Sequence, residues 1–224
     1  RVLLLDHAEK VGKKILISGG GRCNFTNLYC EPGNFLSENP HFCKSALARY
    51  TQYDFMEMVD RHGIAWHEKT LGQLFCDESA RQIVAMLTAE CDAAGVETRT
   101  GCEVRAVGRS DQFRVETGQG SFTADSLVLA TGGLSIPKMR ATGFAHQIAR
   151  QFNLPLTDIR PGLVPLTFAG ETRDLMTGLS GVALNCVATA GTAAFQEAML
   201  FTHRGLSGPA ILQASSYWRH GGDI

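Results

Sequence analysis

The sequence predicts an α/β fold built around a parallel sheet, and three observations support this class. Residues 2–5 form a short continuous apolar run that ends in an acid, as expected of a buried parallel strand. Residues 126–129 repeat the apolar run and lead into a Thr-Gly-Gly turn at 131–133. Between the two runs, a helical pattern at 79–95 and several short strand patterns follow one another.

The other elements follow from hydrophobic periodicity and turn residues. Apolar residues recur at helical spacing over 39–62, and Gly63 ends this predicted helix. Ser79 is placed to cap a second helix, whose apolar stripe stops before Gly95, and a third helix is predicted over 143–152. The predicted strands are 96–100, 103–108, 113–117 and 122–129, with a hairpin or irregular pair at 65–68 and 74–76.

The second half of the chain predicts a change of domain. Three prolines flank or interrupt residues 156–167, which we interpret as a crossing between domains. Beyond it, residues 179–190 and 195–201 are rich in Val, Ala, Leu and Thr and are predicted strands. We therefore expect one domain over 1–160 and the start of a β-rich substrate domain over 161–224.

A triple-glycine segment within residues 15–27 is the clearest functional signal. Glycines can take positive φ and let a ligand approach the backbone, and four polar side chains crowd the same short segment. A plain turn needs fewer glycines and no such cluster, so we predict a ligand cradle. The residues concerned are Gly19, Gly20, Gly21, Arg22, Asn24, Thr26 and Asn27.

The two strand-to-turn junctions suggest which ligand. Asp6 ends the first apolar run, where a carboxylate can accept hydrogen bonds from the ribose of a dinucleotide. The Thr-Gly-Gly turn at 131–133 ends the other run. Together these junctions predict one nucleotide approached from two sides.

Four segments carry a family resemblance. The chain resembles bacterial NAD(P)/FAD-dependent oxidoreductases, the group related to aminoacetone oxidase and bile-acid dehydro-reductases, and the resemblance covers essentially all 224 residues. It implies a three-layer, FAD-binding Rossmann-like domain with an antiparallel β-meander. The matching segments are 14–27, 130–135, 161–165 and 200–209.

The chain also departs from this family. Members begin with a strand followed by Gly-x-Gly-x-x-Gly, a pattern that is found nowhere in this sequence. They end with a returning segment that contains a Gly-Glu or Gly-Asp turn, whereas this sequence stops at residues 221–224, which we place partway through the second domain. We therefore expect a fragment of a longer protein, with both domains incomplete. Because the glycine loop that binds pyrophosphate would be missing, we expect the isolated fragment to bind FAD weakly or not at all.

The resemblance assigns most of the predicted site to FAD. Asp6 would hold the ribose, the triple glycine would lie against the flavin or its ribityl-phosphate arm, and the 131–133 turn would pack from the opposite direction. Val104 falls where related flavoproteins contact adenine, although a plain strand valine explains it equally well. The predicted cofactor-binding residues are Asp6, Lys14, Ser18, Gly19, Gly20, Gly21, Arg22, Cys23, Asn24, Asn27, Val104, Thr131, Gly132 and Gly133.

His203 and Arg204 are the predicted catalytic residues. They lie in a glycine-rich turn, where the histidine can donate a proton and the arginine can hold a carboxylate or polarise a carbonyl. A structural turn is the alternative reading. His62 and His67 lie on predicted surface segments, so we rank them lower.

Composition sets limits on partners and compartment. The formal net charge is −1 and no half is strongly basic, so we expect no nucleic-acid partner. We find no run long enough to span a membrane and no signal peptide, and we expect a cytoplasmic protein. The seven cysteines contain no Cys-x-x-Cys pair, which argues against zinc and thioredoxin-like sites and favours free thiols. A redox role for Cys23, next to Arg22, is the alternative.

The sequence thus predicts an FAD-dependent oxidoreductase that transfers hydride between NAD(P)H or a small organic substrate and the flavin. One alternative is a non-catalytic module that binds FAD or NAD. Another is an inactive fragment of the enzyme. The substrate and the oligomeric state stay open.

Overall fold

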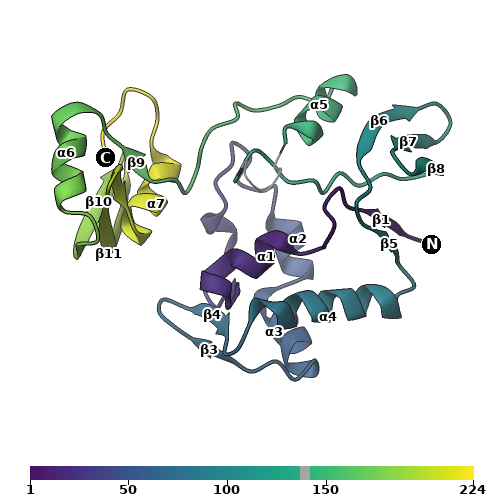
Figure 1. Ribbon diagram of the computed structural model, residues 1–224, viewed down its shortest axis with the longest axis horizontal. Coiled ribbons are helices and arrows are strands. Elements are labelled where there is room, and N and C mark those ends of the chain that lie inside the picture. Colours follow the sequence, from purple (N-terminus) through teal and green to yellow (C-terminus); the bar gives the residue numbers. More distant parts are fainter. Residues whose placement is uncertain (137–141) are drawn as a thin grey trace. The chain divides into compact units, whose positions relative to one another are not determined.

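The computed structural model describes residues 1–136 and 142–224, which form two compact units, Arg1–Phe152 and Asn153–Ile224 (Figure 1). The division comes before the proline-containing segment that we expected to connect two domains. The predicted α/β class is confirmed, since the chain combines helices with parallel and antiparallel sheets. No helix in these described ranges has the length and apolar character needed to cross a membrane.

A parallel pair of strands begins the first unit. β1 (Leu3–Leu5) pairs with β5 (Glu97–Arg99), as the apolar run predicted, and Asp6 N continues the ladder by donating to Arg99 O at 2.9 Å. In the sequence, α4 (Ala80–Ala93) precedes β5 and supplies the helix of a crossover between parallel strands.

Two antiparallel sheets complete the strands of this unit. The hairpin of β3 (Trp66–Glu68) and β4 (Gln73–Cys76) was predicted, but β2 (Asn24–Asn27) was not, and it adds to the far side of β4. The meander is confirmed and consists of β6 (Val104–Arg109), β7 (Phe113–Thr117) and β8 (Gly120–Ala124). It packs on α5 (Phe144–Gln151) through Val107, Val115 and Ile148.

The predicted strand over 126–129 is not found. These residues have no regular secondary structure and belong to no sheet in the described ranges, and Val128 is 84% exposed. Only Leu127 packs against the core beneath the meander. An apolar run becomes a buried strand only where a neighbouring strand satisfies its backbone, and no described strand does so here.

The helix predicted over 39–62 is divided in two. α2 (Lys44–Arg49) ends at Tyr50, and α3 (Gln52–Arg61) begins at a capping box. Thr51 Oγ1 accepts from Asp54 N at 3.3 Å, and Asp54 Oδ2 accepts from Thr51 N at 2.6 Å. Thr51 Oγ1 also donates to Asp54 Oδ2 at 2.7 Å, and this bond, together with the one from Thr51 N, lowers the pKa of Asp54. The box explains the break, because it stabilises a new helix start inside the periodic pattern.

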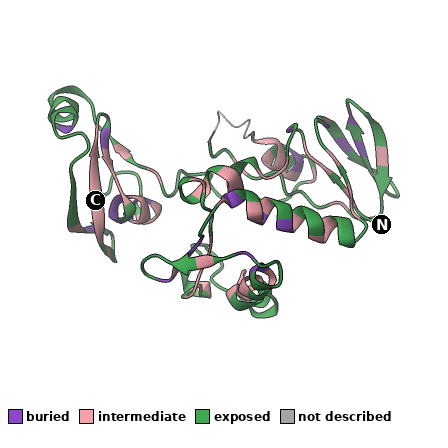
Figure 2. Cartoon of the chain, turned by 60° about the horizontal axis from the view of Figure 1, so that its bottom comes forward, coloured by how far each residue is buried: buried purple, intermediate pink, exposed green. Residues whose placement is uncertain are grey.

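The helix predicted after Ser79 is confirmed as α4. Ser79 Oγ accepts from Arg81 N at 3.2 Å, and Gly95 follows the helix at φ +67°. Buried and exposed residues alternate along α4 with the helical period (Figure 2). Its buried face contacts α3 and the strands β2 and β4 in one core, whose buried members are Cys23, Val59, Ile64, Cys76, Ala80, Ile83 and Met86.

The second unit is β-rich, as predicted, but it also contains two helices that were not predicted. Its strands occur in the order β10-β11-β12-β9, and α7 packs on them through Ala210, Ile211 and Ala214. The elements are β9 (Leu166–Thr167), α6 (Gly170–Gly178), β10 (Ala183–Ala190), β11 (Ala193–Thr202), β12 (Gly205–Ser207) and α7 (Pro209–Tyr217).

Candidate nucleotide-binding site

The triple-glycine segment is not a simple loop. α1 (Lys13–Ile17) comes before it, the glycines lie in a 3₁₀ turn (Ser18–Gly21), and β2 follows. The φ angles of Gly19, Gly20 and Gly21 are +56°, +66° and +87°, in the region that favours glycine. The backbone thus reverses direction between a helix and a strand, which fixes the turn at both ends.

Gly19 and Gly20 have different surroundings. A Cβ on Gly19 would lie 2.6 Å from Phe75 Cε1 and 2.8 Å from Asn24 N, so this glycine packs closely against β4 and β2. A Cβ on Gly20 would meet no atom within 4 Å. Gly19 is therefore required by packing, whereas Gly20 leaves its backbone open to a ligand.

Lys14 connects the two glycine turns. Its Nζ donates to Ser135 Oγ at 2.9 Å and lies 3.8 Å from where a Cβ on Gly132 would be. The sequence separation is 121 residues. The structure thus brings Lys14 and the 131–133 turn together, as the hypothesis of one ligand approached from two sides requires.

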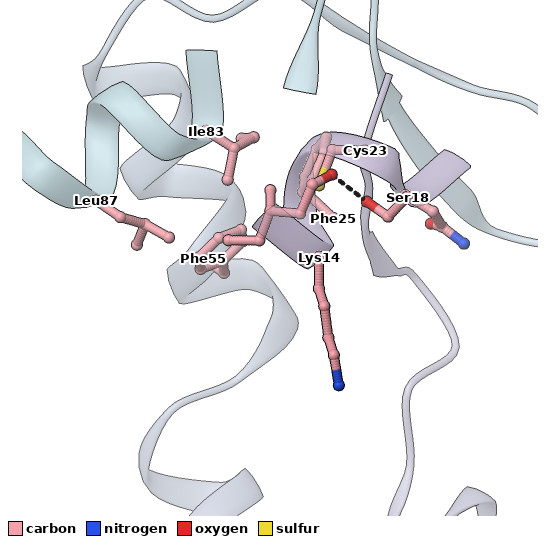
Figure 3. Close-up of a pocket in the computed structure, with 9 residues that line it drawn as sticks. Lys14, Ser18, Cys23, Phe25, Phe55, Ile83 and Leu87 are labelled. Atoms are coloured by element: carbon pink, nitrogen blue, oxygen red, sulfur yellow. Dashed lines mark hydrogen bonds between the residues drawn. The ribbon is translucent and has the colours of Figure 1, made fainter. Parts of the chain in front are cut away.

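A cavity of about 320 Å³ lies beside the triple-glycine segment (Figure 3). Figure 3 shows Phe55, Ile83 and Leu87 gathered on one side, while the Lys14 side chain extends away from them. Ser18 Oγ donates to Ile15 O at 2.8 Å and so closes the end of α1. The lining residues are Lys14, Ile15, Ser18, Cys23, Asn24, Phe25, Phe55, Ile83 and Leu87.

Cys23 faces the core rather than solvent. It is 5% exposed and belongs to the same cluster as Cys76, which is fully buried. Burial, together with the neighbouring Cys23, raises the pKa of Cys76 to about 11. All seven cysteines are free, and the redox role considered for Cys23 stays a prediction.

Asp6 and Val104 lie on other elements of the first unit. Asp6 follows β1, and its Oδ1 accepts from Ala8 N at 2.8 Å. In the described residues, Asp6 makes no hydrogen bond to either glycine turn. Val104 begins β6, where it is opposite Thr117 and packs on the core of the meander. Their roles toward a cofactor stay predictions.

Asn27 lies at a second cavity, of about 350 Å³, rather than at the first. Its Nδ2 donates to Leu71 O at 2.9 Å and its Oδ1 accepts from Tyr29 N at 2.8 Å. Asn27 therefore joins two turns of the chain. The lining residues of this second cavity are Asn27, Tyr29, Cys30, Asn34, Phe35 and Leu71.

The two predicted catalytic residues belong to the second unit. His203 and Arg204 form the two-residue turn between β11 and β12, and both are exposed. Thr202 Oγ1 accepts from Arg204 N at 3.3 Å, and His203 O accepts from Thr177 Oγ1 at 3.1 Å. The turn is thus held through the backbone, and both side chains point from an ordered hairpin.

His146 is a candidate that sequence reasoning missed. A Cβ on Gly133 would lie 3.9 Å from His146 Cε1, so this residue of α5 lies beside the second glycine turn. Its Nδ1 is buried and has no hydrogen-bond partner in the described part of the chain. A lone histidine in a helical pattern carries no signal that could have found it.

His67, which we ranked low, is paired with a carboxylate. Its Nδ1 lies 2.6 Å from Asp77 Oδ1, and its ring stacks on Phe75. His62 makes a similar pair with Glu90, at 2.7 Å, which lowers the pKa of Glu90. Because two such pairs occur on the surface of one unit, the pairing itself does not mark a catalytic group.

Several known proteins are similar to this chain. A protein of Escherichia coli strain K12 named ribosomal RNA dihydrouridine synthase is 56% identical over 224 residues, covering 99% of this chain and 56% of the relative. A Haemophilus influenzae protein of the same name is 49% identical, covering 97% and 56%. A 3-dehydro-bile acid delta(4,6)-reductase of Clostridium scindens is 30% identical over 169 residues, covering 74% and 41%. The chain thus spans just over half the length of the first two relatives.

These names overturn one expectation. We expected no nucleic-acid partner because the net charge is −1, yet two similar proteins are named for an activity on ribosomal RNA. The inference failed because net charge averages over a whole chain, whereas contacts to RNA depend on local groups. Both relatives are also longer than this chain, which covers 56% of each.

The family assignment agrees with the geometry and, in part, with the predicted resemblance. All three relatives have enzyme names, and one is a bile-acid reductase, as the resemblance implied. The model of a Rossmann-domain family matches residues 1–203, which include both glycine turns and His203 but stop before Arg204. The chain therefore belongs to the family described as the HI0933-like protein Rossmann domain.

Proposed function

We propose that this chain is the cofactor-binding part of an FAD-dependent reductase whose substrate is uridine in ribosomal RNA. The observation that carries the proposal is the 56% identity, over 99% of this chain, to a protein named ribosomal RNA dihydrouridine synthase. The distant relative named as a bile-acid reductase supports reduction as the class of chemistry. This substrate replaces the small organic molecule that we expected.

The residues around the glycine turns fit an FAD molecule. Gly20 leaves its backbone open, and the Lys14 ammonium lies at the 131–133 turn, where it can pair with a phosphate or with the N1–C2=O edge of the flavin. Asp6 ends a parallel strand, the position from which a carboxylate accepts hydrogen bonds from ribose.

A bound flavin supplies hydride transfer, and we propose NAD(P)H as the source of electrons. Conversion of uracil to its dihydro form adds one hydride and one proton across the C5=C6 bond. The protein must therefore hold the base, exclude water and provide the proton. His203 and Arg204 are our candidates for proton donation and substrate contact, because both are exposed on an ordered hairpin.

Spectroscopy of the full-length protein tests the proposal. We expect a flavin absorption spectrum that NADH or NADPH bleaches without oxygen, and recovery of colour when ribosomal RNA lacking the modification is added. Mass spectrometry of the RNA should then show dihydrouridine. His203→Gln should slow the RNA-dependent recovery more than the bleaching, with His62→Gln as the control. A colourless protein, or a bound flavin that neither nucleotide reduces, would contradict the proposal.

A further inference from the structure

The second cavity of the first unit has the chemistry of a base-binding site. It is open, measures about 350 Å³ and lies between the turn after β2 and the turn from β3 to β4. No charged side chain lines it. Its two aromatic rings are notably exposed, Tyr29 by 66% and Phe35 by 45%, although exposed aromatic rings stabilise a fold little.

The wall of this cavity is fixed in place. A Cβ on Gly72 would lie 2.7 Å from Tyr29 Cδ2 and 2.7 Å from Asn27 Oδ1, so the backbone at Gly72 supports the tyrosine ring. Leu71 has φ +52°, a conformation that leucine rarely adopts. Strain of this kind persists where the surroundings impose it, and it is concentrated at ligand sites.

Asn34 provides a free donor at the rim. Its Oδ1 accepts from Glu31 N at 2.7 Å, which fixes the orientation of the amide. Its Nδ2 makes no hydrogen bond to any described residue, in contrast to Asn27, whose amide uses both of its polar atoms. The site therefore offers two ring faces and an oriented N–H donor.

We propose that this cavity binds one unstacked uracil base of single-stranded RNA, with a ring face on Tyr29 or Phe35 and a uracil carbonyl accepting from Asn34 Nδ2. The inference rests on the proposed function and adds the place where the base is held. Proteins read RNA mainly through unstacked bases that stack on aromatic side chains, and enzymes that modify a base take it out of the stack. Asn27, which lines the cavity, is the last residue of β2, the strand that follows the triple-glycine segment.

The segment that follows the cavity suits the flanking nucleotides. Residues 39–53 contain no Asp or Glu, and Gln52 Nε2 ties this segment to the cavity by donating to Leu28 O at 3.0 Å. Cations there can pair with phosphates, and exposed rings can stack on neighbouring bases. The basic side chains are His41, Lys44 and Arg49, and the exposed aromatic ones are Phe42, Tyr50 and Tyr53.

Binding of two RNA probes to the full-length flavoprotein tests the proposal. One probe is a short dye-labelled single strand with a central uridine, and the other has an abasic nucleotide at that position. We expect Tyr29→Ala or Phe35→Ala to weaken binding of the uridine probe roughly 5- to 150-fold, and Asn34→Ala roughly 2- to 10-fold. Binding of the abasic probe and the flavin absorbance should not change, and the Tm of the two aromatic variants should stay the same. Asn34→Ala also loses the bond from Glu31 N and should have a slightly lower Tm. Trp218→Ala, which removes an exposed ring of the second unit, is the control.

Three results would overturn the assignment. Equal binding of the two probes by the unmodified protein would show that no base is held. Loss of flavin from Tyr29→Ala would show that the cavity holds cofactor. A lower Tm with unchanged RNA affinity would show that the rings pack against another part of the protein. Failure of the proposed function would give a different result. The flavoprotein would still prefer the uridine probe, but it would form no dihydrouridine in the RNA.

Discussion

Two single alanine substitutions, at the adjacent glycines of the triple-glycine turn, distinguish the glycine needed for packing from the glycine that leaves room for a ligand. Gly19 and Gly20 have φ angles of +56° and +66°, so either alanine adopts a left-handed conformation that costs about 1–2 kcal/mol. Only at Gly19 does the new methyl group collide, at 2.6 Å from Phe75 Cε1 and 2.8 Å from Asn24 N. Overpacking adds about 1–3 kcal/mol. We therefore expect Gly19→Ala to lower the free energy of unfolding by about 2–5 kcal/mol and Gly20→Ala by about 1–2 kcal/mol.

Urea unfolding of the full-length protein measures this difference. Gly33→Ala is the control, because Gly33 has no positive φ and no atom within 4 Å of its added Cβ. Its midpoint should stay close to that of the unmodified protein. Equal destabilisation by Gly19→Ala and Gly20→Ala, within about 0.5 kcal/mol, would refute the assigned packing of Gly19 against Phe75.

Gly20→Ala, the variant expected to lose less stability, should nevertheless lose affinity for the cofactor. The methyl group of Gly20→Ala enters open space, where we propose that the cofactor lies, so this folded variant should bind FAD more weakly than Gly33→Ala does. Fluorescence titration of the apoprotein with FAD measures both. Unchanged FAD affinity in Gly20→Ala would show that no cofactor approaches this backbone.

Three further predictions concern single contacts, and a fourth concerns RNA. Lys14→Ala should weaken FAD binding about tenfold or more in the same titration, whereas Ser135→Ala, which keeps the charge, should change it little. Thr51→Ala should destabilise the fold by about 1 kcal/mol in urea, through loss of the α3 cap. The pKa of Cys76 is raised to about 11, so its thiol stabilises the fold below about pH 9, and up to about 3 kcal/mol should be lost between about pH 9 and 11. Unfolding midpoints against pH should show that loss in the unmodified protein and not in Cys76→Ala. Lys44→Ala should reduce the slope of log affinity against log salt for single-stranded RNA by about 0.7.

The sequence patterns correctly predicted those elements that are stabilised by signals within their own segment. The α4 helix has a serine cap, one apolar face and a glycine after its last turn, and all three signals lie within its own sequence. The meander likewise follows from short alternating strands and tight turns. Lys14 and the 131–133 turn were placed in one site by the resemblance, and the structure brings them together.

The elements that were missed depend on distant partners. β2 is a strand because β4, about fifty residues later, supplies its hydrogen bonds, and glycine-rich polar sequence gives no sign of that partner. Residues 126–129 show the reverse case, since an apolar run without a described neighbour forms no strand. The base cavity was missed for the same reason. Leu71 and Tyr29 are far apart in sequence and are brought together by the pairing of β2 with β4 and by the side-chain bonds of Asn27.

Our expectation of no nucleic-acid partner was wrong for a physical reason, and the same reason agrees with the proposal that the second cavity binds a base. Net charge reports the long-range field of a chain, and a total of −1 does not tell where on the surface the charges lie. Uptake of a single base depends instead on ring faces and one oriented donor, none of which contributes to net charge. Tyr29, Phe35 and Asn34 are uncharged, and the cations of residues 39–53 are offset by carboxylates elsewhere in the chain. A protein that reads an unstacked uridine can therefore have the composition of an ordinary soluble enzyme, so exposed aromatic residues are a better guide to such a substrate than total charge.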